Sequence, residues 1–198
     1  KGTVKTLTLK CNVASTADSN SVFQWGLGSA PSISVTGVTS SNDVTETVTA
    51  GNGAVMTNAS GSLVVSTNSN SPSYKVAAAG TTGNEAGIFT FRATNEAVNL
   101  NRVSLKLTNT ASSSASSLVQ VSIWDGATQV GTAVFTGTNT YATSTFSSPV
   151  SLPKDTDKAL TVNVDFSNIG TSQPGTQGHL VAIDLNSSDS TGTQGTGV

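Results

Sequence analysis

The feature that most constrains the fold of this chain is the alternation of apolar and polar residues in short segments separated by turn-forming residues. The pattern is clearest in residues 61–108, where serine, asparagine, glycine and proline interrupt the apolar runs. Because successive side chains of a β-strand point to opposite faces of the sheet, a period of two predicts half-buried strands. Within this stretch we expect four strands, at residues 63–66, 74–78, 87–94 and 98–108.

The rest of the chain continues the pattern, and no segment keeps the apolar spacing of an amphipathic helix over three turns. Asp125-Gly126 lies between two alternating runs and predicts a β-hairpin with a type I′ turn. A break in parity at Asn101-Arg102 predicts a bulge or a bend. Many short strands joined by turns favour an all-β fold, an antiparallel immunoglobulin-like β-sandwich. The other strands are expected at residues 3–13, 21–27, 32–38, 44–49, 118–124, 128–136, 140–152, 159–166 and 179–185.

The composition excludes several classes of function. Only 10% of the 198 residues are charged, against roughly 25% in typical soluble domains. Serine, threonine, asparagine and glycine take their place, which is typical of secreted β-proteins. The net charge of −2 and the scattered basic residues argue against nucleic-acid binding, which needs a basic patch. No apolar run reaches the ~18 residues of a membrane span.

An internal similarity indicates how the chain is organised. Residues 5–13 (KTLTLKCNV) match residues 158–166 (KALTVNVDF) at every apolar position, with Cys11 opposite Val164. If the match marks a repeat, residues 1–50 are the closing strands of a preceding unit or a donor strand. Residues 51–60 are then a linker, and residues 61–198 form the main β-sandwich. The start at Lys1 fits either a removed leader or a piece of a longer chain, and the turn-like end GTQGTGV favours the second, a longer tandem array.

Residues 61–198 also resemble a known kind of repeat. The phrases SPSYKVAAAGTTG, FTFRATNEAVNLNRVSLKLT, VSIWDGATQVGTAVFTG and YATSTFSSPVSLPKDTDKALTV follow one another in this part of the chain. In this order they resemble the tandem β-sandwich domains of very large surface proteins from uncultivated bacterial lineages with small genomes. The resemblance implies an extracellular, S-layer-like or adhesin-like protein at the cell surface. It implies no functional residue, and residues 1–50 fit it less well.

His179 and Cys11 are of residue types that often act in catalysis, but the sequence around them does not favour that role. His179 is the only histidine, and no G-x-S-x-G or comparable nucleophile motif accompanies it. We therefore expect a turn or surface histidine. Cys11 is the only cysteine, so an intrachain disulfide is excluded. Because its counterpart is Val164 and a free cysteine packs like a small apolar residue, we expect Cys11 in a core. We predict that the protein is not an enzyme.

Acidic residues near a turn give the best metal hypothesis. Asp155 and Asp157, with Asp165 or Asp189 nearby, are candidates for binding Ca²⁺, which takes six to eight oxygen ligands. The spacing is a weak signal by itself, and the flanking Lys154 and Lys158 compete for the carboxylates. A solvated charged turn is the favoured interpretation, and we expect no other cofactor.

Other candidate sites are weaker still. Trp25, Trp124, Tyr74 and Tyr141 could stack on a sugar, although a sandwich of this size needs most of its aromatic residues inside; Trp124, beside the predicted hairpin turn, is the one expected to be exposed. An isopeptide crosslink could join Lys106 or Lys75 to an asparagine, with Glu96 as the acid. Asn58-Ala-Ser and Asn186-Ser-Ser match the glycosylation pattern, mostly by chance in bacteria.

These patterns together favour a structural protein of an extracellular assembly, either an S-layer or a pilus-like filament. Its β-sandwich units would be joined by strand pairing and apolar contacts with other copies or neighbouring repeats. The segment expected to pair carries Leu7, Leu9, Cys11 and Val13 on one face. The alternative is an adhesin or carbohydrate-binding module that binds a glycan. We expect neither nucleic-acid binding nor membrane insertion.

Overall fold

The structure is a computed structural model that describes residues 3–14, 17–28, 33–49, 51–108, 114–186 and 192–198. The chain divides into two compact units, Lys1–Ser60 and Gly61–Val198. The described residues form antiparallel sheets and no α-helix; the one helical turn is the 3₁₀ helix η1 (Ala115–Ser117). The all-β fold class predicted from the alternation is confirmed.

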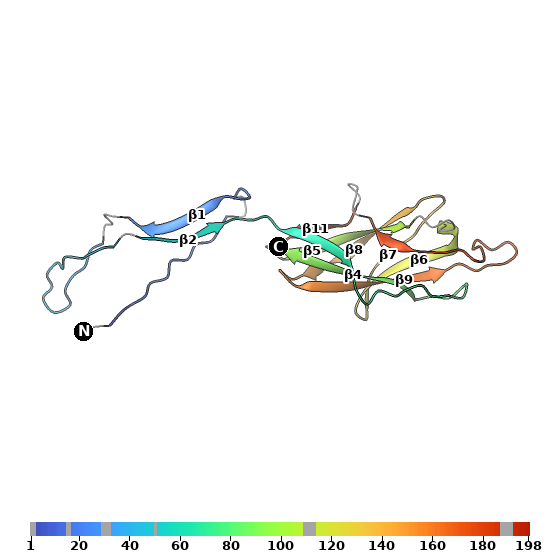
Figure 1. Ribbon diagram of the computed structural model, residues 1–198, viewed down its shortest axis with the longest axis horizontal. Helices are drawn as coiled ribbons and strands as arrows, with labels where there is room; N and C mark the ends of the chain where they lie inside the picture. The colour runs from blue at the N-terminus through green and yellow to red at the C-terminus, as the bar shows by residue number, and fades with distance from the viewer. Residues whose placement is uncertain (1–2, 15–16, 29–32, 50, 109–113, 187–191) are drawn as a thin grey trace. The chain divides into compact units, whose positions relative to one another are not determined.

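The larger unit contains a five-stranded sheet whose strands β4, β9 and β6 run side by side in Figure 1. Its long central strands pair over most of their length, from Asn84↔Val164 to Arg92↔Asp157. These strands are rich in β-branched and aromatic residues on the buried face, which favours a pleated ladder. In order across the sheet, the strands are β3 (Ser62–Thr67), β4 (Asn84–Thr94), β9 (Asp157–Phe166), β6 (Leu118–Asp125) and β7 (Thr128–Ala133).

A second sheet forms around β5 (Val98–Leu107). One side of β5 pairs with β8 (Tyr141–Leu152), and the other pairs with β10 (Ile183–Leu185) near one end and β11 (Gln194–Gly197) near the other. Leu100 and Arg102 of β5 pair with the consecutive residues Gly195 and Gln194 of β11, so Asn101 is an extra residue in β5. The register with β8 also shifts between Leu100 and Arg102. This irregularity lies where the parity of the sequence breaks, so the predicted bulge or bend is confirmed.

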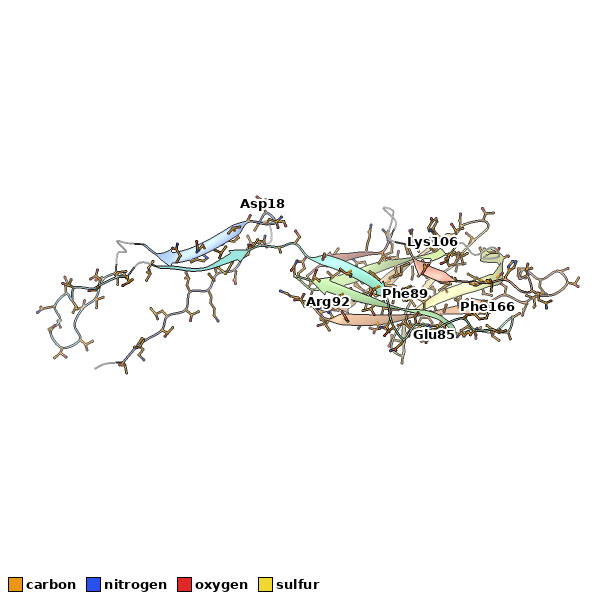
Figure 2. The ribbon with its side chains drawn as sticks, viewed as in Figure 1. Asp18, Glu85, Phe89, Arg92, Lys106 and Phe166 are labelled. Carbon is orange, nitrogen blue, oxygen red and sulfur yellow. The ribbon has the colours of Figure 1, made fainter. Side chains whose placement is uncertain are left out.

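A single hydrophobic core draws on both sheets. Phe91 and Leu160 from the first sheet, and Leu100, Leu105 and Leu152 from the second, are 0–1% exposed. Each sheet therefore contributes the apolar face of its alternating strands. Phe89, labelled in Figure 2, is another member of this core. The arrangement is consistent with a β-sandwich.

The immunoglobulin-like strand order stays a prediction. Immunoglobulin domains place strands A, B, E and D in one sheet and C, F and G in the other. Here β3, β4, β9 and β6 lie in the order of A, B, E and D, and β5 lies in the second sheet, as C does. β5 pairs with β8 on one side and with β10 and β11 on the other, and of these only β10 and β11 follow β9 in the chain, as F follows E.

The hairpin predicted around Asp125-Gly126 is confirmed, but with a different turn. Asp125 pairs with Thr128, so Gly126 and Ala127 are the two central residues of the turn. Gly126 has φ +58°, and Ala127 is not among the residues with positive φ. A positive φ at the first central position alone fits a type II′ turn and not the type I′ turn expected.

The smaller unit contains one two-stranded sheet, β1 (Val22–Leu27) with β2 (Gly51–Thr57). The segment at residues 51–60 was expected to be a linker, and this expectation is wrong for its first seven residues, which form β2. The register pairs Phe23 with Met56, so the brief apolar break in the segment belongs to a strand. Beyond the sheet, Asn20 N donates to Asn58 O at 2.6 Å, and Asn58 N donates to Ser21 O at 2.8 Å.

The strand expected at residues 3–13 is not formed. Residues 3–14 have no secondary structure, and every one of them is exposed, Cys11 included. The placement of Cys11 in a core is therefore wrong. Residues 158–166, their counterpart in the internal similarity, lie in β9 between two neighbouring strands. Alternation makes a strand only where another strand supplies its hydrogen bonds, and residues 3–14 have no such neighbour among the described residues.

Other expected strands are absent or shorter for the same reason. Strands were expected at 32–38 and 44–49, but residues 33–38 and 44–49 form none, and Ser32 lies outside the described residues. Thr36 forms an isolated bridge with Asp43, which precedes the second of these segments. Residues 72–78 form no strand, although one was expected at 74–78. The strand expected at 179–185 is reduced to β10, because only its last three residues pair with β5.

Candidate functional site

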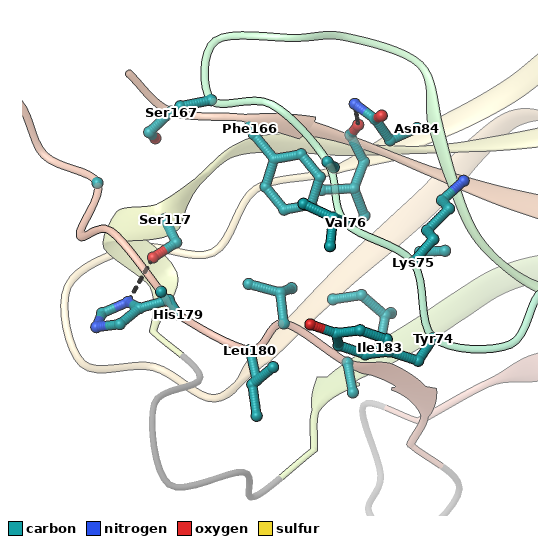
Figure 3. Close-up of a pocket in the computed structure, with 18 of the residues that line it drawn as sticks. Tyr74, Lys75, Val76, Asn84, Ser117, Phe166, Ser167, His179, Leu180 and Ile183 are labelled. Atoms are coloured by element: carbon teal, nitrogen blue, oxygen red, sulfur yellow. Dashed lines mark hydrogen bonds between the residues drawn. The ribbon is translucent and has the colours of Figure 1, made fainter. Parts of the chain in front are cut away.

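A groove in the larger unit is the best candidate for a functional site. It has a volume of about 700 Å³, within the roughly 300–1,000 Å³ typical of binding pockets. Its two sides are residues 72–79, which follow β3 in the chain, and residues 175–183, which lead into β10. Figure 3 shows Val76, Leu180 and Phe166 around its apolar interior.

The first side of the groove is a stretch of chain held only at its ends. Before it, the backbone N–H of Ile88 donates to Ser71 Oγ at 2.9 Å. After it, Phe166 N donates to Thr81 O at 2.9 Å. Between these anchors, residues 73–77 make no backbone hydrogen bond with any described residue. Their peptide groups are therefore free to pair with another strand, as at the edge of a sheet.

The apolar side chains of this stretch are also uncovered. Tyr74 is 78% exposed and Val76 is 87% exposed, although both line the groove. Exposed apolar residues are common when single, but contiguous ones that line a concave surface are typical of interaction sites. The stretch thus offers both an unpaired backbone and an uncovered apolar surface.

The second side of the groove is tied to the rest of the unit. Ala182 O accepts a hydrogen bond from Thr108 N at 2.9 Å, which directs this segment along β5. A parallel bridge joins Ile169 to Gly175. A Cβ atom added at Gly175 would lie 2.8 Å from Asn168 O, so only glycine allows this close approach of two backbone segments.

His179 lies at one end of the groove and contacts a buried serine. Its Nδ1 atom is 2.7 Å from Ser117 Oγ, as the dashed line in Figure 3 shows. A catalytic serine–histidine pair needs an acid that orients the imidazole. Among the described residues no carboxylate bonds to His179, so the contact joins η1 to residues 175–183 and does not complete a triad. A turn or surface histidine was expected, and His179 follows a turn and is half-buried.

The predicted calcium ligands do not gather in one place. Asp157 Oδ1 is 2.8 Å from Arg92 Nη1, and this hydrogen bond, with the charge of Asp157, raises the pKa of Arg92. Asp165 bonds elsewhere, to Gly83 N at 2.7 Å and Gln120 Nε2 at 2.8 Å. No group of three or more acidic, histidine or cysteine residues occurs in the described ranges. Asp189 lies outside them, and binding of Ca²⁺ at Asp155 and Asp157 stays a prediction.

The residues proposed for an isopeptide crosslink are engaged in other contacts. The Lys106 Nζ atom lies 5.6 Å from the centre of the Tyr141 ring. Glu96 Oε1 accepts a hydrogen bond from Gly61 N at 3.2 Å. Lys75 lies in the groove and is exposed, whereas such crosslinks need a buried lysine. The structure gives no support to the crosslink.

The aromatic and glycosylation candidates are similarly dispersed. Trp124 was expected to be the most exposed aromatic residue, but it is half-buried, and its Nε1 atom donates to Ser122 Oγ at 2.9 Å. Tyr74 is more exposed than Trp25 or Tyr141. Asn186 is 3% exposed and cannot receive a glycan in the folded state. Asn58 Nδ2 donates to backbone oxygens at 3.1 and 3.2 Å.

Comparison with known proteins adds no relative to this description. No family model, curated protein or solved structure matches the chain. In the part of the chain that the structure describes, no helix is long and apolar enough to cross a membrane. The described residues thus define an antiparallel all-β protein with a groove along an unpaired backbone stretch.

The groove was not predicted from the sequence. Residues 74–78 alternate like a strand, and the alternation gave no sign that their backbone would stay unpaired. Residues 175–183 read as a turn followed by a strand, with no indication that they would face residues 72–79. The one available signal was Pro72, because proline favours strand edges and ends and cannot donate to a ladder.

Proposed function

We propose that this protein is a structural component of an extracellular assembly, an S-layer or a pilus-like filament. Its β-sandwich units would be joined to other copies or to neighbouring repeats by strand pairing and apolar contacts. One observation carries the proposal: residues 3–14 alternate like a strand, yet Leu7, Leu9 and Val13 are 95%, 72% and 52% exposed. An alternating segment with no strand beside it has its hydrogen-bonding groups and its apolar face available to a partner.

Pairing of this segment with a partner needs apolar burial and backbone hydrogen bonds together. Burying one leucine or valine side chain contributes about 1.5–3 kcal/mol. Fixing the backbone costs roughly 1–2 kcal/mol per residue, so the apolar contacts must act together with the hydrogen bonds of a complete ladder. Isolated in water, a two-stranded sheet is itself only marginally stable. The nearly fully exposed β1–β2 sheet gives a second reason to expect packing between units.

Composition supports an extracellular location. With 10% charged residues, the polar surface consists mainly of hydroxyl and amide groups. Lysine and glutamate residues on edge strands commonly prevent edge-to-edge association in monomeric proteins, and few are present here. Units of this kind could be linked along one chain or associate without covalent bonds. Both arrangements use the same contacts.

The proposal is tested by the size of the purified chain as a function of concentration. We expect light scattering to give a mass well above 19.9 kDa and negative-stain microscopy to show filaments or a lattice. Leu7→Asp/Leu9→Asp should reduce the assembly to single chains. Thr6→Asp/Thr8→Asp is the matched control, because it adds the same charge to the opposite face and should keep much more of the assembly. Single chains at high concentration in the unchanged protein would refute the proposal.

A second candidate function is supported by one observation. Tyr74 presents an exposed ring in a groove that also contains Asn84 and Glu85, and an aromatic face beside polar groups is suited to a sugar. In this case the isolated protein would bind glycans on an array, and Tyr74→Ala would abolish the binding. Binding that depends on Tyr74 without any self-association would favour the adhesin function over the structural one.

A further inference from the structure

We propose that the groove is the acceptor site for a β-strand from a second copy of this chain, and that residues 5–13 of that copy are the strand. The inference rests on the proposed function and assigns the two surfaces that meet. The groove lies in one unit and the strand belongs to the other, so each copy carries one donor and one acceptor. The contact is therefore head-to-tail, and it produces open chains unless the rotation closes a ring.

The backbone of the groove has the property that strand addition needs. Residues 72–78 contain no turn or bend, and residues 73–77 make no backbone hydrogen bond with the described residues. Hydrogen bonds at Ile88 and Phe166 hold the two ends of the stretch, so little order would have to be gained on binding. An extended peptide laid along such an edge obtains affinity from its main-chain hydrogen bonds.

The side chains of the groove match an alternating strand. Val76 on one side is 87% exposed, Leu180 on the other is 46% exposed, and Phe166 between them is half-buried. Side chains at every second position of an added strand point toward one surface. On residues 5–13 these are Leu7, Leu9, Cys11 and Val13, and the opposite positions are Thr6, Thr8, Lys10 and Asn12. The apolar set would cover the groove while the polar set faces water.

The chain itself provides the reason to assign its own segment as the occupant. Residues 3–14 are exposed throughout, and Leu7 and Leu9 are among the most exposed large apolar residues described. The groove is likewise an apolar surface with an unpaired backbone. One chain thus contains an alternating segment without a described strand beside it and an unpaired backbone stretch along an apolar groove. Pairing between copies satisfies both surfaces, and the repeated contact extends the assembly by one copy at a time.

Complementation between two full-length variants tests the assignment. Leu7→Asp/Leu9→Asp removes the donor face, and Val76→Asp places a charge in the acceptor. Val76 is 87% exposed, so its replacement leaves the core intact. We expect each variant alone to have the mass of a single 19.9 kDa chain. Their equimolar mixture should form a complex of twice that mass and no larger, because it contains one functional donor and one functional acceptor.

Controls separate the assignment from the function on which it rests. Val64→Asp changes another exposed valine, on β3 and outside the groove, and should assemble like the unchanged chain. If Leu7→Asp/Leu9→Asp is a single chain but Val76→Asp still forms the full assembly, the acceptor is elsewhere; the inference is overturned and the proposed function stands. If Leu7→Asp/Leu9→Asp assembles normally, the donor is another segment; the inference is overturned and the proposed function stands. Single chains of the unchanged protein at high concentration would overturn both.

A disulfide experiment identifies which copy provides the strand. Val76→Cys adds a thiol to the groove, and Cys11 supplies the only other one. Mild oxidation should produce linked dimers and longer chains on a non-reducing gel, and Cys11→Ser in the same background should lose the products longer than a dimer. A disulfide closed within one chain, without linked dimers, would show that the strand occupies the groove of its own copy and would overturn the assignment.

Discussion

Ser144 in β8 gives a sharp test of how the two sheets meet. Its side chain is 1% exposed, and its Oγ atom makes no hydrogen bond with any described group. A buried hydroxyl without a partner costs about 1–3 kcal/mol of desolvation. Ser144→Ala replaces the hydroxyl group with a hydrogen atom, which loses only a few dispersion contacts, each worth about 0.1–0.2 kcal/mol. We therefore expect Ser144→Ala to stabilise the larger unit by about 1 kcal/mol, or roughly 3–5 °C in the unfolding midpoint.

The neighbouring Gly131 on β7 turns this expectation into a double-mutant cycle. A Cβ atom added at Gly131 would collide with Ser144 Oγ and lie 2.7 Å from Cε1 of Phe146, a ring that is 7% exposed. Overpacking of this kind costs about 1–3 kcal/mol. Because Ser144→Ala removes the nearest of these atoms, Gly131→Ala should cost less in that background, with a coupling of at least about 0.5 kcal/mol.

The measurement is urea unfolding of the four proteins in the cycle, followed by circular dichroism and tryptophan fluorescence. A change in midpoint without a change in slope reports a change of stability alone. If Ser144→Ala destabilises the protein by 1 kcal/mol or more, the hydroxyl must have a bound partner, such as a buried water molecule. Additive effects of the two substitutions would show that β7 and β8 do not approach each other as described.

Three further results are expected. Phe91→Ala, at a side chain 1% exposed, should lower the free energy of unfolding by about 3–5 kcal/mol, whereas Val64→Ala, at an exposed position, should lower it little. Equal losses in denaturant unfolding would contradict the described core. Because the pKa of Arg92 is raised, its interaction with Asp157 stabilises the fold at every pH below the ordinary arginine range. Arg92→Ala should therefore lower the unfolding midpoint by the same small amount at every pH from 5 to 10. A difference that grows across this range would show that the Asp157 contact is not the source of the effect. Ser117 should not react with a fluorophosphonate probe, and labelling detected by intact mass would indicate an activated serine and a hydrolase.

The alternation of residues was sufficient to predict the strands that lie inside the sheets. Residues 87–94, 98–107, 118–124 and 159–166 are strands in the structure because each has apolar residues on one face and a neighbour on at least one side. The bulge near Arg102 followed from the same period, since a single extra residue reverses which face each side chain occupies. These features are local, so the sequence contains enough information to place them.

The same reasoning failed where the outcome depends on distant residues. Residues 5–13 and 158–166 have nearly the same pattern, but only the second lies between two strands, β4 and β6. The turn between β6 and β7 was assigned to Asp125-Gly126, and the pairing of Asp125 with Thr128 shifted it by one residue. Cys11 was placed in a core by its similarity to Val164, and it is exposed because its segment has no sheet to join.

Residues 61–108 show the division between the two kinds of information. The sequence by itself determined that this protein is all-β and antiparallel, and it determined which side chains of β4 and β5 are buried, because period-two alternation specifies one apolar face. Only the tertiary structure decided that residues 73–77 would remain unpaired beside residues 175–183 and form a groove. Backbone pairing depends on which segments meet in space, and the local pattern of side chains does not encode that meeting.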